Sequence, residues 1–146
     1  MKALRGDELL ALPLRLNGIK LGRPVDLLLD RDELRVLGVE VSCRNRSHRF
    51  LPFPAARIDN GTLSVSSPLV LLEEDELAFY SARALRLSSL RGRPVTQNGR
   101  PLGLLADVVI DRTGTVVELV VSRDGDERPV PYGDSVRLPS ERRSVA

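Results

Sequence analysis

The chain has 146 residues, 42% of them hydrophobic and 29% charged, and its net charge is only +2. This composition is typical of a folded globular protein and argues against both a disordered chain and a strongly basic nucleic-acid binder. No apolar run approaches the roughly 20 residues that a membrane-spanning helix needs. The early acids Asp7 and Glu8 argue against a signal peptide, so we expect no membrane span and a cytoplasmic location.

The first strong signal along the chain is Asn17-Gly18, because a tight β-hairpin turn needs positive φ angles, which Asn and Gly accept. A long apolar strand follows. A turn from Asp30 to Glu33 leads into a strand in which Leu37, Val39 and Val41 alternate with more polar residues. Two further short strands are predicted around Asn60-Gly61.

An acidic connector occupies residues 68–87. Acidic residues favour the first turn of a helix, so the sequence predicts a short helix from about Glu73 to Arg83. Leu77 and Tyr80 would face the β-structure.

The second part of the chain repeats the first. Residues 17–31 and 98–112 align without gaps, and seven of the fifteen positions are identical: Asn17, Gly18, Leu21, Gly22, Asp26, Asp30 and Arg31. Downstream, residues 36–42 match residues 116–122. The predicted organisation is a first repeat at 1–67, the connector at 68–87, a second repeat at 88–139 and a disordered tail at 140–146.

Alternation and the repeat together select a core. Its expected residues are Leu21, Val25, Leu27, Leu29, Leu37, Val39 and Val41 in the first repeat, and Leu102, Val108, Ile110, Val117, Leu119 and Val121 in the second. The runs at 27–29 and 108–110 are apolar on both faces, so a second cover is needed, for which the other repeat is the simplest candidate. The second repeat also lacks the closing strand that residues 63–65 provide in the first. We expect the connector to cover that open side, with the N-terminal segment 4–10 or another chain as alternatives.

The repeated pattern of Leu-Gly, then Asp, three aliphatic residues and a second Asp resembles the PRC-barrel family. The residues that carry it are Leu21-Gly22, Asp26 and Asp30, then Leu102-Gly103, Asp107 and Asp111. The family takes its name from the cytoplasmic domain of the photosynthetic reaction-centre H subunit. The resemblance implies an all-β chain with two small antiparallel β-barrels packed as a pseudo-symmetric pair, joined by a short helix. It transfers no functional residue, because the Asp and Gly positions look like scaffold.

No constellation predicts catalysis, a metal or a cofactor. The only cysteine, Cys43, and the only histidine, His48, are too few for a zinc site and lack an oriented base. Asp30 and Asp111 are better explained as turn-capping residues.

Two stretches are rich in arginine, and we expect them to form any charge-driven, partner-binding surface. Their residues are Arg44, Arg46, Arg49, Arg83, Arg86, Arg91 and Arg93. The predicted function is a non-enzymatic protein-interaction or scaffold module of a bacterial cytoplasm, with an unknown protein as partner. An RNA- or ribosome-associated accessory protein remains the alternative, and a homodimer stays open.

Overall fold

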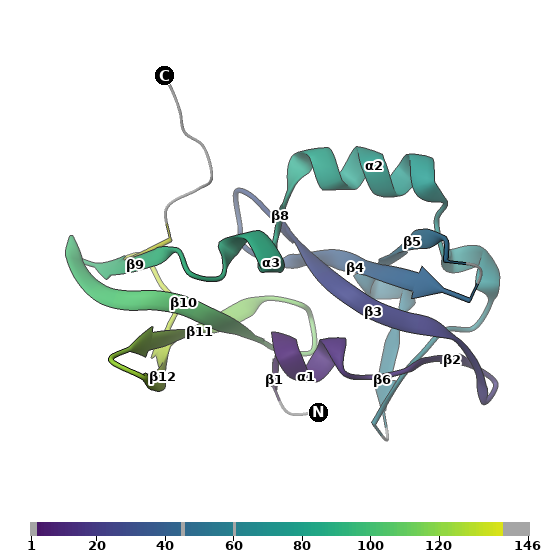
Figure 1. Cartoon of the computed structure of the whole chain (residues 1–146), viewed down its shortest axis with the longest axis horizontal. Helices are drawn as coiled ribbons and strands as arrows, with labels where there is room; N and C mark the ends of the chain where they lie inside the picture. The colour runs from purple at the N-terminus through teal and green to yellow at the C-terminus, as the bar shows by residue number, and fades with distance from the viewer. Residues whose placement is uncertain (1–2, 45, 60, 139–146) are drawn as a thin grey trace.

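The computed structural model describes residues 3–44, 46–59 and 61–138, and this part of the chain folds as two β-sheets with three short α-helices (Figure 1). The first sheet has the strand order β5-β4-β3-β2-β7-β6, and the second has the order β12-β11-β10-β9-β13. The strands of the first sheet are β2 (Leu14–Leu16), β3 (Ile19–Asp30), β4 (Val36–Cys43), β5 (His48–Pro52), β6 (Arg57–Asp59) and β7 (Thr62–Ser64). Those of the second are β9 (Pro94–Gln97), β10 (Arg100–Ile110), β11 (Val116–Arg123), β12 (Asp126–Pro131) and β13 (Val136–Arg137).

The predicted all-β class is confirmed, but in the described residues the pairing does not run from the last strand of either sheet back to its first. Each half is therefore built on an open, barrel-like sheet, as the all-β prediction requires. In the first sheet, β7 pairs with β2. At the equivalent position of the second sheet, the short β13 pairs with β9. The second sheet thus has a small strand at the edge where we expected none.

The turns form as the sequence predicts. Asn17 and Gly18 have φ angles of 50° and 82°, and Asn98 and Gly99 have 51° and 80°, which is the tight hairpin geometry. Asp30 accepts a hydrogen bond from the Asp32 N–H. Asp111 likewise accepts hydrogen bonds from the N–H groups of Thr113 and Thr115. Both aspartates therefore cap their turns.

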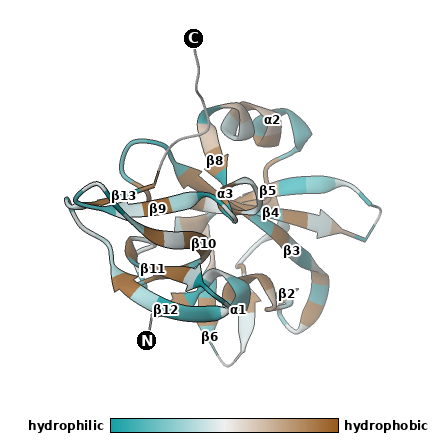
Figure 2. Cartoon of the chain, turned by 60° about the vertical axis from the view of Figure 1, so that its left-hand side comes forward, coloured by the Kyte–Doolittle hydropathy of each residue, from teal (hydrophilic) through white to brown (hydrophobic). Residues whose placement is uncertain are grey.

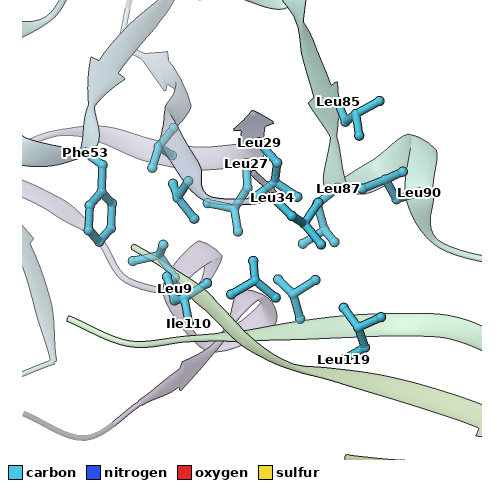
Figure 3. Close-up of a cluster of buried hydrophobic side chains, with 14 of the residues drawn as sticks. Leu9, Leu27, Leu29, Leu34, Phe53, Leu85, Leu87, Leu90, Ile110 and Leu119 are labelled. Carbon is cyan, nitrogen blue, oxygen red and sulfur yellow. The ribbon is translucent and has the colours of Figure 1, made fainter. Parts of the chain in front are cut away.

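The inner faces of both sheets share one hydrophobic core, in which side chains from the two halves point toward each other (Figure 3). Most of the predicted core residues are buried there, and Leu21, Leu37 and Leu102 are partly buried. Val25 and Val117 are wrong predictions, with 40% and 36% exposure. Each lies at a β-bulge, and a bulge shifts the inward–outward alternation by one residue.

The connector covers the first sheet, not the second. Helix α2 (Glu74–Arg83) begins as predicted, and its buried Leu77 packs with Leu28 of β3, while the ring of Tyr80 stacks on that of Phe50 at 4.5 Å. A 3-10 turn, η2 (Pro68–Val70), precedes it, and another, η1 (Phe53–Ala55), follows β5. The second cover of β3 is therefore this helix, which corrects the expectation that the other repeat provides it. The expected tail, 140–146, lies outside the described residues.

Each half sends a short arm to the other half's sheet. The first arm is β1 (Leu4–Arg5) with α1 (Gly6–Leu10), and β1 pairs with β10 of the second sheet. The second arm is β8 (Ala84–Arg86) with α3 (Leu87–Leu90), and β8 pairs with β3 of the first sheet. The two registers are equivalent, since Leu4 lies opposite Ile110 as Leu85 lies opposite Leu29. The halves are thus joined by a reciprocal exchange.

A buried aspartate holds each arm. Asp107, with no exposed surface, accepts hydrogen bonds from the Asp7 N–H at 3.1 Å and the Val108 N–H at 2.8 Å, and its carboxylate pairs with the Arg5 guanidinium at 3.2 Å. In the other half, Asp26 accepts from the N–H groups of Ser88, at 3.1 Å, and Leu27, at 2.9 Å. Its carboxylate pairs with Arg86 at 3.3 Å. Each carboxylate therefore satisfies a free N–H in the first turn of the arm's helix.

The observed pairing corrects our expectation that the connector covers the open side of the second sheet. Strand β13 pairs with β9 on that side, whereas the N-terminal arm pairs with β10, and Leu9 of this arm is fully buried in the shared core. Removing residues 1–10 would therefore open the core, so the truncated chain is not expected to keep its stability.

We predict that Leu9→Ala lowers the free energy of unfolding by about 3 kcal/mol, because it deletes a buried side chain and leaves a cavity. Leu69→Ala is the matched control, since Leu69 is 87% exposed, and its effect should stay within about 0.5 kcal/mol. Urea unfolding of both variants measures the difference. Equal stabilities of the two variants would contradict the placement of the first arm.

We predict that Asp107→Ala lowers the free energy of unfolding by about 3 kcal/mol, because it leaves Arg5 and two backbone N–H groups without their buried acceptor. The exposed Asp126→Ala in the same half is the control and should be nearly neutral. Amide hydrogen exchange should also show faster exchange in the first arm of Asp107→Ala. A stable variant with an unchanged arm would refute the anchoring role.

Candidate interaction surface

Four of the seven predicted partner-binding arginines are engaged within the molecule. Arg86 pairs with Asp26 and Glu40, and Arg91 pairs with Asp7 and Asp107. The guanidinium of Arg83 lies 3.8 Å from the centre of the Phe79 ring, and Arg93 donates a hydrogen bond to the carbonyl oxygen of Ser89. Arg86 and Arg91 therefore have structural roles in this fold.

The ion pairs of Arg86 belong to a network on the α2 side of the first sheet. The guanidinium of Arg86 donates to Glu40, and the other oxygen of Glu40 lies beside Nδ1 of His48. Burial by itself would raise the pKa of Glu40, but the hydrogen bonds from His48 and Arg86 outweigh it and lower that pKa from its ordinary value of 4.5. The only histidine of the chain is thus engaged with a buried carboxylate.

Arg44, Arg46 and Arg49 do lie together, in and beside the β4–β5 loop. Arg44 and Arg46 are exposed. Arg49 is half-buried and lines a hollow of about 260 Å³ with the acidic residues at the start of α2, Glu73, Glu74 and Asp75. The acidic turn therefore partly offsets the charge of Arg49, and Arg44 and Arg46 are the more available cations of this group.

A larger hollow, of about 520 Å³, lies at the start of β3 and the end of β4, at the hairpin side of the first sheet. It is lined by Ile19, Lys20, Gly22, Arg23, Ser42, Cys43 and Arg44. Lys20, Arg23 and Arg44 are exposed, no acid lines the hollow, and no ion pair joins these cations to any carboxylate of the described residues. The hollow thus combines three uncompensated positive charges with an exposed apolar side chain, Ile19.

Two features of the backbone and side chains shape this hollow. A Cβ at Gly22 would collide with the carbonyl oxygen of Ser42, and one at Gly103 would collide with that of Ser122, so the repeated glycine permits the close approach of two strands. Cys43 is half-buried in the wall, and burial raises the pKa of its thiol, which makes it a poor nucleophile.

The sequence prediction included Arg44 but missed Lys20, Arg23 and Ile19. A signal was present in the comparison of the repeats: Lys20, Arg23 and Arg44 align with Pro101, Leu104 and Asp124. All three cations are therefore absent from the corresponding positions of the second half. The two repeats share their scaffold residues, whereas this surface is where they differ.

Within the described ranges, no group of three or more His, Cys, Asp or Glu residues is arranged to hold a metal ion. In that same part of the chain, no helix is long and apolar enough to cross a membrane.

We predict that Glu40→Gln lowers the free energy of unfolding at pH 7 by about 2 kcal/mol, because it weakens hydrogen bonds to charged groups. The pKa of Glu40 is lowered in the folded state, so its contribution is complete above 4.5 and is lost as the pH falls through the folded-state pKa. The difference from the parent chain should therefore shrink as the pH falls below 4.5. Glu33→Gln, at an exposed turn position, should be nearly neutral at pH 7, and a constant difference for Glu40→Gln would contradict the network.

Comparison with known proteins fits this architecture. No curated protein matches the chain. Residues 83–142 match the family model of the PRC-barrel domain. The matched segment includes the second arm, so the domain's own first strand, β8, is paired with the sheet of the other half. The chain therefore contains a PRC-barrel domain at residues 83–142.

Proposed function

We propose that the chain is a non-enzymatic protein-interaction module of the bacterial cytoplasm, built from two PRC-type units, and that its first half binds an acidic protein. The observation that carries the proposal is the group of uncompensated cations around the larger hollow, Lys20, Arg23 and Arg44. Complementary charge raises the rate of encounter and selects between partners. An acidic protein is therefore the partner that this surface favours.

The proposal of two units rests on the first half as well as on the matched second half. Strands β2 to β5 are joined in the same order as β9 to β12, and both long strands carry a buried aspartate that binds the other half's arm. The same sequence pattern produces both sets of contacts. We therefore interpret the first half as a second copy of the PRC-type unit.

A non-enzymatic role is supported by the state of the two side chains that are most often catalytic. His48 is engaged by Glu40, and the thiol of Cys43 is half-buried with a raised pKa. General base catalysis needs a base directed at the reacting group, and thiol catalysis needs a thiolate.

The alternative of an RNA-associated protein is less well supported. The chain has three Phe, two Tyr and no Trp, and no aromatic residue lines the larger hollow. Proteins that bind single-stranded nucleic acid use aromatic side chains as stacking platforms beside their cations. The hollow offers cations with an aliphatic neighbour, which suits a protein segment better.

The test is capture from a nuclease-treated lysate of the native cell, followed by identification of the protein and measurement of its affinity for the purified chain. We expect an acidic protein whose binding weakens as the salt concentration rises. The double substitution of Lys20→Glu and Arg44→Glu should weaken that binding at least about tenfold, because it creates like-charge contacts.

The second half provides a matched control for this charge reversal. Arg100→Glu with Arg123→Glu makes the same change at exposed positions near the corresponding place in the second half, and it should leave the affinity almost unchanged. Binding that nuclease abolishes would favour RNA. An equal loss in both double variants would show that net charge alone drives the interaction and would overturn the proposed site.

A further inference from the structure

The larger hollow continues into a second one along the start of β3. The second hollow, of about 330 Å³, is lined by residues 10–13, Lys20, Arg23 and Pro24. Lys20 and Arg23 line both hollows. The two hollows therefore adjoin at these two cations, and together they are called the β3 groove below.

The walls of the β3 groove change character along its length. One end presents Ile19, which is 62% exposed, together with Cys43 and Arg44. The other end is lined by residues at the end of the first arm and just after it, Leu10, Ala11, Leu12 and Pro13. Its surface is mainly polar, and Leu10 and Leu12 pack against the shared core. The main exposed apolar side chain of the groove is therefore Ile19.

We propose that the β3 groove binds an acidic segment of a partner protein in which the carboxylates lie between aliphatic side chains. The carboxylates would contact Lys20 and Arg23, with Arg44 as a third cation, and an aliphatic side chain would cover Ile19. This inference rests on the proposed function and specifies the chemistry of the segment recognised.

The chemistry of the groove distinguishes this occupant from a small anion. A phosphate or a sulfate would pair with the cations but would leave the side chain of Ile19 in contact with water. A segment with both kinds of side chain gains from charge pairing and from the burial of apolar surface. The groove therefore fits an amphipathic acidic segment better than a free anion.

The test uses synthetic peptides of about ten residues that contain no cysteine. One has two acidic residues between leucines; in the second the acids are replaced by their amides, and in the third the leucines are replaced by serine. Fluorescence anisotropy measures their affinities for the full chain. We expect the first peptide to bind at least about tenfold more tightly than either of the others, with salt weakening the binding.

The single cysteine reports where the peptide binds. Because Cys43 lines the groove and no other residue carries a thiol, the acidic leucine peptide should slow the reaction of the chain with a thiol reagent. The serine peptide should not. No protection of Cys43 by a tightly bound peptide would place the binding elsewhere and overturn the inference.

Substitutions separate this inference from the proposed function. Ile19→Ser should lower the affinity of the chain for the acidic leucine peptide about fivefold, because it removes exposed apolar surface. Leu104→Ser, at an exposed apolar position of the second half, should leave that affinity unchanged. If none of the three peptides binds while the captured protein still depends on Lys20 and Arg44, the segment chemistry is wrong and the proposed function stands. If the captured protein ignores both cations, the proposed function itself fails.

Discussion

The carboxylates of Asp26 in β3 and Asp107 in β10 are buried, and each binds the backbone and an arginine of an arm that comes from the other half. Burying a charge is costly unless it is paired and fully hydrogen-bonded. The fold satisfies each carboxylate with N–H groups and guanidinium groups, and one of those N–H groups and the hydrogen-bonded arginine come from the opposite half. Neither half therefore supplies every partner of its own aspartate, and the core beneath the arms is shared by both halves.

The arrangement around these aspartates is kept by different residues in the two halves. Arg86 is held by Asp26 and Glu40, whereas Arg5 is held by Asp107 and Glu127. In the alignment of the repeats, Glu40 corresponds to the apolar Val120. Strand pairing gives a second correspondence, because His48 lies opposite Ser42 in the first half and Glu127 lies opposite the equivalent Ser122 in the second. The second carboxylate thus lies on β4 in the first half and on β12, the equivalent of β5, in the second. Both halves place two acids around one partly buried arginine, but they do so from different sequence positions.

The sequence analysis succeeded where the determinants are local and failed where they are not. Asn17-Gly18 fixes a hairpin and the acidic residues at 73–76 favour a helix within a few residues of chain, so both were predictable. Val25 and Val117 were misplaced because a bulge depends on strand pairing, which alternation alone does not contain. The exchange of arms could not be predicted for the same reason. Leu4-Arg5 and Leu85-Arg86 match in the two copies, but the local sequence does not determine that each strand pairs with the sheet of the other half. Lys20 and Arg23 were missed because the sequence does not show which exposed cations line the same hollow.

Fusion of the two halves in one chain allows contacts that two identical subunits could not make. In a symmetric pair, a residue near the axis faces its own copy. Here Gly6 faces Leu87, its equivalent in the repeat, and a Cβ on Gly6 would collide with the Leu87 side chain. Arg35 likewise pairs with its equivalent, Thr115, in an isolated bridge. The centre of the molecule has thus become asymmetric while the arms remain reciprocal. The outer surfaces have diverged in the same way, so that the cations of the β3 groove belong to one half only. Because the two halves share one core and exchange arms, the second half supports a surface that it does not itself carry.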